Sequence, residues 1–313
     1  MQRHLSTRAA VVATLLVAAS PATLSAHTGV PIAPHDLWSA WTWSLPISVP
    51  LVLTLVLYVV GTRALWAQAG VGRGIKRWQA AAFGAGWLVL AIALLSPLHA
   101  LGEALFAAHM AQHELLMTVA APLIVLGRPL VPTVFALRPS ARAGATSWTQ
   151  LPAFRAGWRR LTHPGTAWLL HAAAIWVWHS PPLYEATLRS EFVHALQHIS
   201  FIATALLFWW TVLHPAWSGR GVAMLSLFTT MVHTGALGAI IALSGTLWFP
   251  AYAATTRAWG LTPLEDQQIG GLIMWIPGSA AYLIAALGLL GVSLRHSERR
   301  GRTWPAPAME AAR

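Results

Sequence analysis

Long apolar segments follow one another through this chain and restrict it to one class of fold. A helix that crosses the hydrocarbon core of a bilayer needs roughly 20 mainly apolar residues. Seven segments meet that requirement, and they lie at 45–62, 79–98, 104–126, 165–183, 192–213, 221–244 and 267–292. Because a helix satisfies its backbone hydrogen bonds internally, we predict an all-α fold, a polytopic membrane protein built as a bundle of seven transmembrane helices.

The amino-acid composition points to the same class. Charged residues make up only 9% of the 313 residues, whereas ordinary soluble domains carry about 25%. The net charge is +11, but the basic residues lie in the connections rather than among aromatic residues, so we expect a lipid bilayer and no nucleic acid as partner. The chain has no cysteine, which excludes disulfides, thiolate zinc sites and CxxC copper carriers.

The basic residues are concentrated in alternate connections and therefore predict the orientation. The connection at 127–164 and the tail at 293–313 are rich in arginine, whereas only Arg189 and Arg257 fall on the opposite side. Since cytoplasmic connections carry the excess of Lys and Arg, we predict a periplasmic N-terminus and a cytoplasmic C-terminus in a bacterial inner membrane. Residues 127–164 then form a cytoplasmic loop.

The N-terminal residues have the pattern of a secretory signal. Arg3 and Arg8 are followed by a short apolar stretch and then by small residues, so we predict a signal peptide at 1–26. Cleavage would leave a periplasmic segment at 27–44 before the transmembrane domain at 45–292. An uncleaved anchor is the alternative.

Histidine is unusually frequent, with 14 residues against 9 acidic ones. Two pairs share the pattern H-x-x-Q-H: His109 with His113, and His194 with His198. The i, i+4 spacing places both rings of a pair on one helix face. Both pairs lie near the predicted outer start of a span, where an ionisable residue indicates function. We therefore predict that four imidazoles meet at one metal site.

Other residues near these ends extend the predicted site. Imidazole suits Cu(II) and zinc, and thioether selects Cu(I), so a mixed His and Met site without thiols favours copper over zinc. Plain packing is the alternative for the methionines, and a hydrogen bond to a neighbouring helix is the alternative for each lone histidine. Residues expected to orient the imidazoles or to attract the cation are Gln112, Gln197, Glu114, His179, His35, Glu265 and Asp266. Glu265 and Asp266 have a second interpretation, as caps of the last helix.

Several of these residues stand in longer motifs. The run His109-Met-Ala-Gln-His113-Glu-Leu-Leu-Met continues into Ala121-Pro-Leu and Leu126-Gly-Arg-Pro, and further motifs lie at 194–210, 233–250 and 265–275. Over roughly 35–292 the sequence resembles the CtaG family of membrane assembly factors for caa3-type cytochrome c oxidase. The resemblance implies a seven-helix bundle and a non-enzymatic role in assembling a haem–copper oxidase, with an oxidase subunit as partner and copper as the metal.

The resemblance also assigns residues. The matched positions are His109, His113, His194, His198, His233, Asp266 and Met274. We therefore predict metal ligands at His109, His113, His194, His198, His233 and Met274.

Two other functions stay open at this stage. Paired histidines on two helices also suit a haem-b membrane redox protein, in which each helix supplies one axial ligand. A metal transporter would need polar groups throughout the membrane, and His171 and His233 hint at such a path. Enzymatic chemistry is not indicated, because His113-Glu114 is not followed by the second histidine of an HExxH motif.

Overall fold

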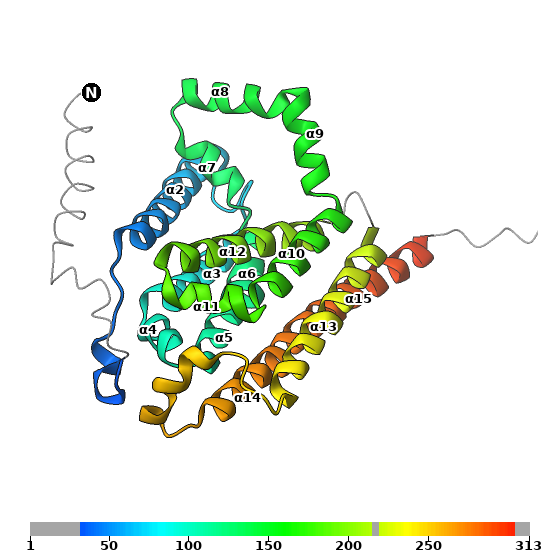
Figure 1. The fold of residues 1–313 in the computed structure, drawn as a ribbon. Helices are drawn as coiled ribbons and strands as arrows, with labels where there is room; N and C mark the ends of the chain where they lie inside the picture. Colours follow the sequence, from blue (N-terminus) through cyan, green and yellow to red (C-terminus); the bar gives the residue numbers. More distant parts are fainter. Residues whose placement is uncertain (1–31, 215–218, 304–313) are drawn as a thin grey trace, which may run out of the picture. The chain divides into compact units, whose positions relative to one another are not determined.

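The structure, a computed structural model, describes residues 32–214 and 219–303, with side chains at all of these except 296 and 299–303. The predicted signal peptide at 1–26 lies outside the described residues. Every regular element in the described residues is helical, and all of these helices belong to the unit Pro31–Arg313 (Figure 1).

Six helices are long and apolar enough to cross a membrane, which indicates a multi-pass membrane protein. Three are single elements: α2 (Leu45–Ala69), α3 (Arg77–Leu95) and α12 (Glu191–Leu213). A fourth is α13 (Gly219–Leu243). The other two are composite helices, formed by α5 (Phe106–Glu114), η2 (Leu115–Ala120) and α6 (Ala121–Leu126), and by α14 (Pro263–Ile273), η5 (Met274–Gly278) and α15 (Ser279–Thr303).

The predicted span at 165–183 is shorter in the structure. It forms α10 (Pro164–Trp178), whose 15 residues extend about 22 Å along the axis, against the roughly 30 Å of a hydrocarbon core. The helix ends here because Ser180, which precedes Pro181, is extended at φ −66° and ψ 132°. Pro181 then begins α11 (Pro181–Arg189). The predicted C-terminal boundary at 183 is therefore wrong, and α10 is not among the six candidate spans.

Both composite helices widen to a π-helix next to a proline. Pro277 lies inside η5, and Pro122 is the second residue after η2 ends at Ala120. A proline ring clashes with the carbonyl one turn earlier, and a π turn is one way for a helix to accommodate that distortion. Neither widening was predicted from the hydrophobic pattern, because apolar periodicity does not report the width of a turn.

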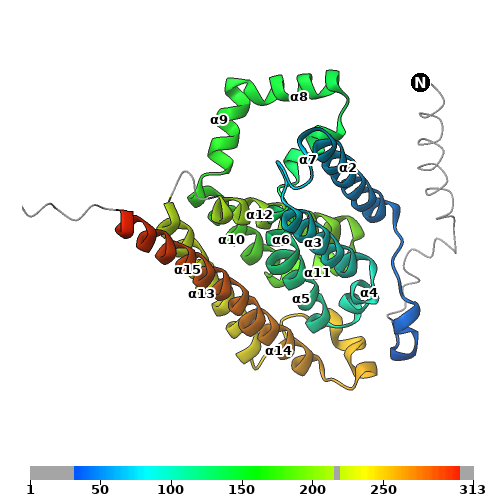
Figure 2. The ribbon, with the colours of Figure 1, turned by 180° about the vertical axis from the view of Figure 1, so that it is seen from behind.

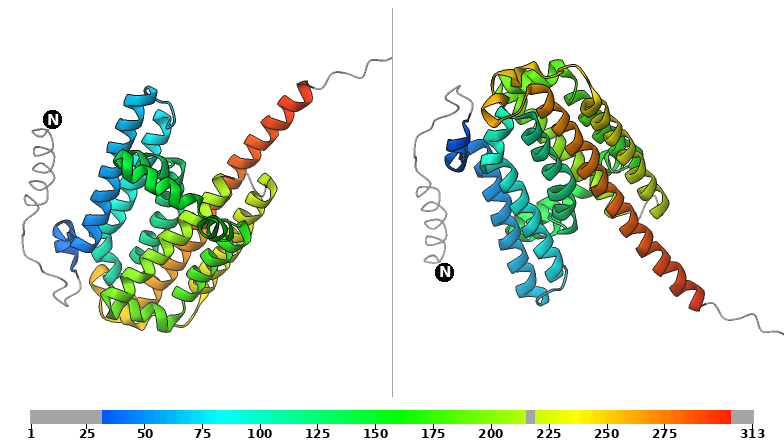
Figure 3. Two further views of the ribbon diagram at one scale, coloured as in Figure 1. Left: turned by 90° about the horizontal axis from the view of Figure 1, so that it is seen from above. Right: turned by 90° about the horizontal axis from the view of Figure 1, so that it is seen from below.

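The helix Phe106–Leu126 lies at the centre of the bundle. Of its apolar window 56% is buried, against 17–44% for the other five candidates. It packs against α3, α12 and α14, and α13 packs against both α14 and α15 (Figures 2 and 3). The helix that carries the first histidine pair is therefore enclosed by other helices rather than by lipid.

Glycine allows α13 and α14 to approach closely. A Cβ atom on Gly271 would lie 2.5 Å from the backbone nitrogen of Ala242, and one on Gly238 would lie 2.7 Å from that of Trp275. Small residues at such a crossing let the two backbones pack directly against each other.

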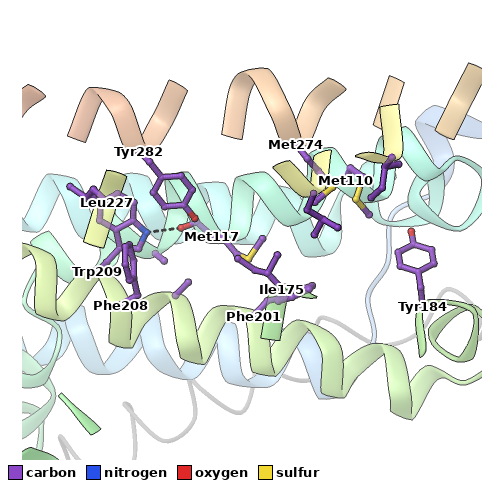
Figure 4. Close-up of a cluster of buried hydrophobic side chains, with 14 of the residues drawn as sticks. Met110, Met117, Ile175, Tyr184, Phe201, Phe208, Trp209, Leu227, Met274 and Tyr282 are labelled. Carbon is purple, nitrogen blue, oxygen red and sulfur yellow. Dashed lines mark hydrogen bonds between the residues drawn. The ribbon is translucent and has the colours of Figure 1, made fainter. Parts of the chain in front are cut away.

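The apolar core lies beside this crossing (Figure 4). Trp209 of α12 stacks on Tyr282 of α15, with ring centroids 5.8 Å apart, and donates its indole N–H to the carbonyl of Met117 at 2.8 Å. Because Met117 lies in η2, this hydrogen bond fixes α12 to the π segment of the central helix.

The loop 127–164 contains three further helices, α7 (Leu130–Ala136), α8 (Pro139–Gln150) and α9 (Pro152–Leu161). Neither α8 nor α9 has a buried residue, and both lie at the top of Figure 1, away from α4 (Pro97–Ala104) and the start of α14. Large apolar side chains such as Trp148 and Trp158 are exposed on them.

Candidate metal site

The two H-x-x-Q-H motifs face each other across α5 and α12. Within each pair the ring centroids are 4.4 Å apart for His109 and His113, and 4.3 Å apart for His194 and His198. Between the helices, His109 lies 5.1 Å from His194, and His113 lies 5.3 Å from His198. The structure therefore brings together the four imidazoles that were predicted to share one site.

The imidazole nitrogens form two sets of three. In the first set, His109, His113 and His198, the three ligand atoms lie within 4.8 Å of one another. The second set, His99, His194 and His198, meets the same limit. Three imidazole nitrogens form a ligand set suited to copper or zinc.

His99 joins the site from a helix that is not a candidate span. Ser96 caps the start of α4 by accepting from the backbone N–H of Leu98 at 3.3 Å, and Pro97 takes the first helical position. The helix then folds back onto α5, where His99 is 5% exposed. Ser96-Pro97 was the available sequence signal, but it predicts where a helix starts and not what that helix contacts.

Hydrogen-bond acceptors flank the ring of His109 on both sides. Its Nδ1 lies 3.2 Å from the carbonyl oxygen of Gly102, and its Nε2 lies 3.3 Å from Oε1 of Gln197. A neutral imidazole has one N–H, so it can donate to only one of these two oxygens. In the tautomer that donates from Nδ1 to Gly102, the lone pair on Nε2 is left for a metal. Binding a metal there requires that the Gln197 contact be released.

Two buried tyrosines, which were not predicted as site residues, complete this environment. The Tyr252 hydroxyl lies 3.2 Å from Nδ1 of His109 and donates to the carbonyl oxygen of Gly102 at 2.9 Å. The Tyr184 hydroxyl lies 2.9 Å from the Tyr252 hydroxyl. Burial raises the pKa of both tyrosines well above the ordinary value, so both remain neutral phenols. No motif marks them, because they come from α11 and from η3 (Pro250–Ala254).

Several buried imidazole nitrogens in this cluster have no hydrogen-bond partner. They are both ring nitrogens of His113, Nε2 of His198 and Nε2 of His179. An unsatisfied buried polar group costs about 1–3 kcal/mol, and most such groups in folded proteins are paired. Metal ligation would satisfy one nitrogen each of His113 and His198, which belong to the sets of three, and these imidazoles fit a copper ion.

His179 lies beside the first set. Its ring centroid is 6.0 Å from that of His113, and its Nδ1 donates to the carbonyl of Ile175 at 2.6 Å. A neutral ring that donates from Nδ1 carries its lone pair on Nε2.

The two acidic residues at the start of α14 have different roles. Glu265 forms a capping box with Thr262 and so caps α14 itself. Asp266 is fully buried, and its carboxylate accepts from the backbone N–H groups of Phe106 at 2.7 Å and Ala107 at 3.0 Å. The prediction that Asp266 attracts a cation at the mouth is wrong, since it caps the helix that carries His109 and His113.

Three predicted residues lie in other surroundings. His35 is exposed on η1 (Pro34–Ser39), with its ring 3.2 Å from Asp36. His233 accepts at Nδ1 from the indole of Trp176 at 3.3 Å, and neither set of three includes it. Met274 lies in the apolar core with Met110 and Met117 (Figure 4).

A separate polar group lies next to the cluster. The carboxyl group of Glu114 packs against Gly278, where a Cβ atom would lie 2.8–2.9 Å from it, and its Oε2 is buried without a partner. One turn beyond Gly278, the Tyr282 hydroxyl lies 3.3 Å from Nε2 of His171. Polar side chains therefore continue past the imidazoles within the bundle.

Comparison with known protein families shows to which family this chain belongs. The model of the Caa3_CtaG family, described as cytochrome c oxidase caa3 assembly factor, matches residues 56–296. The chain belongs to the Caa3_CtaG family. The match confirms the resemblance seen in the sequence motifs and contains every imidazole of the two sets.

Curated relatives are longer than this Caa3_CtaG chain. It is 27% identical over 255 residues to the uncharacterized proteins Mb0105 of Mycobacterium bovis and MT0111 of Mycobacterium tuberculosis, which covers 76% of this chain and 37% of each relative. It is 24% identical over 225 residues to the uncharacterized protein ML1998 of Mycobacterium leprae, a match that covers 68% of this chain and 34% of that relative. The chain thus spans about a third of the length of these relatives. No solved structure matches it.

Proposed function

We propose that this protein binds copper at the paired histidines of α5 and α12 and supplies it to a haem–copper cytochrome c oxidase during assembly. One observation carries the proposal: His113 and His198 contribute buried ring nitrogens that have no partner in the protein, and they meet two further imidazoles. Family membership supports the client, an oxidase.

The ligand chemistry supports a donor rather than a store. A protein that delivers a metal needs ligands that exchange, and this chain has no cysteine to hold copper as a thiolate. Each pair lies in the first turns of its helix, so the metal stays close to one end of the bundle. Zinc fits imidazole as well, and metal content separates the two.

Seven crossings account for this geometry better than six. The first turns of α5 and α12 lie together, so both helices enter the membrane from the same side. The chain must therefore return across the membrane between residues 126 and 191. The helix α10, which packs against α12 and α13, is the element available for that return.

The arginine distribution supports the orientation. The connection 127–164 is then cytoplasmic, the start of α5 and α12 periplasmic, and the protein a resident of the bacterial inner membrane. A cleaved signal at 1–26 belongs to the same proposal, since it delivers the N-terminus to the periplasm.

Replacement of His109 and His113 by asparagine tests the function. We expect normal abundance of the protein in the membrane and loss of most copper from the client oxidase, because two of the imidazoles that face α12 are removed. Copper content and activity of the purified oxidase are the measurements. His233→Asn is the matched control, since His233 is a bundle histidine outside both sets. Normal oxidase copper at normal abundance of the double variant contradicts the proposal.

A metal transporter is the second candidate function, and one observation favours it. The polar side chains of Glu114, Tyr282 and His171 continue inward from the cluster. Copper flux into sealed vesicles that contain the purified protein would identify a transporter. A Soret band would instead identify the haem-b protein.

A further inference from the structure

The two sets of imidazoles share one member. His198 belongs to the set with His109 and His113 and also to the set with His99 and His194. A neutral imidazole carries a lone pair on only one of its two nitrogens. The ring of His198 can therefore complete one set or the other, but not both at once.

We propose that the two sets are successive positions of a single copper ion, which passes between them by exchange at His198. The inference rests on the proposed function, because it takes copper as the cargo. No electron is transferred in this step: one group of neutral nitrogen ligands replaces another around the same ion.

The two positions differ in depth. His99 comes from α4, which is not a candidate span, and His194 lies one turn closer than His198 to the start of α12. His113 lies one turn further into the central helix than His109, and these two residues are only 2% and 0% exposed. The set with His99 is therefore the outer position, and the set with His113 is the inner one.

The two positions also differ in how firmly they hold a metal. Nδ1 of His99 accepts a hydrogen bond from the Gln112 amide at 3.0 Å, and that amide also donates to Ala93 at 2.7 Å. A metal at Nδ1 must displace this amide, or the ring must change its tautomer. The inner set also contains a ring contacted by a glutamine, His109, but both nitrogens of its member His113 lack a partner. We expect the inner position to bind more tightly and the outer one to exchange more readily.

The glutamines of the two motifs fit this division. Gln112 contacts His99 of the outer set, and Gln197 contacts His109 of the inner set. Each H-x-x-Q-H motif thus supplies a glutamine that holds one set, which gives a reason for a glutamine at the same place in both.

Anaerobic loading of the full chain in detergent with Cu(I) tests the inference. We expect the wild type to retain one copper per chain and to release it to an added Cu(I) chelator. His99→Asn should retain one copper but release it about tenfold more slowly, since the exchangeable position is lost. His113→Asn should bind about tenfold more weakly and release faster. His198→Asn should lose retention.

Controls separate this inference from simpler explanations. His233→Asn should behave as the wild type, and thermal unfolding of each variant checks its fold. His99→Gln is the second variant, because it keeps a polar side chain of greater length. Two copper ions in the wild type, or an unchanged release rate in both His99 variants, overturns the inference alone. A wild type that retains no copper overturns the proposed function as well.

Discussion

At the residue scale, the spacing of the histidines carried much of the information about the site. The i, i+4 pairs could be read from the sequence because a helix places such residues on one face. His99, Tyr184 and Tyr252 could not be read in this way, since they reach the cluster from elements whose packing no local pattern encodes. His233 is the opposite case, a histidine that was predicted as a ligand but lies outside both sets. It contacts two tryptophans, Trp176 and Trp168, instead.

Removal of the Tyr252 hydroxyl tests directly how the ring of His109 is held. Tyr252→Phe removes its bonds to Gly102 and to the imidazole. We expect about tenfold weaker copper binding and a loss of about 1 kcal/mol of stability. Tyr58→Phe is the matched control, because the buried Tyr58 hydroxyl donates to Gly127 at 2.8 Å away from the cluster. It should lower stability and leave copper affinity unchanged; equal affinity losses in both variants would contradict this role of Tyr252.

At the element scale, hydropathy predicted the existence of the helices better than their ends and turns. Most predicted boundaries lie within a few residues of the helices, but α2 continues to Ala69 and α15 to Thr303. Residues 63–69, mostly good helix formers such as alanine, leucine and arginine, extend α2, and a polar segment rich in arginine extends α15. The interpretation of Glu265 and Asp266 as caps of the last helix is confirmed for Glu265. The Asp266 carboxylate instead bonds to the start of α5, 160 residues away in the chain, which no local pattern indicates.

The crossing of α13 and α14 depends on the absence of a side chain at Gly271. Gly271→Ala places a methyl group 2.5 Å from the Ala242 backbone, which forces the helices apart. We expect a loss of about 1–3 kcal/mol of stability, measured by unfolding in detergent. Gly288→Ala in α15 meets nothing within 4 Å and should be neutral or slightly stabilising. Equal stability of the two variants would show that the close approach contributes nothing.

At the scale of the whole molecule, composition predicted the class of fold and the sequence motifs predicted the family. The number of membrane crossings depends on one short helix. α10 has the apolar character of a span but ends early at Ser180-Pro181. The proposal that α10 crosses the membrane rests on the meeting of the two histidine pairs, a tertiary contact that no hydropathy profile contains.

Labelling of single cysteines tests the seven crossings. The chain has no cysteine of its own, so each introduced thiol reports one position. Ser147→Cys in α8 should react with a membrane-impermeant reagent only after the cells are opened. Ala253→Cys, in the connection between α13 and α14, should react in intact spheroplasts. Both residues are exposed, so a failure to react does not come from burial. Labelling of both from the same side would rule out this topology.

The metal and haem content of the purified full chain tests the central claim most directly. The comparison is between the wild type and a variant in which His109, His113, His194 and His198 are all replaced by asparagine. Our account predicts that the wild type retains copper and shows no Soret band, and that the variant reaches the membrane in similar amount and retains none. Equal copper in the two proteins, or a Soret band that the variant loses, would contradict it.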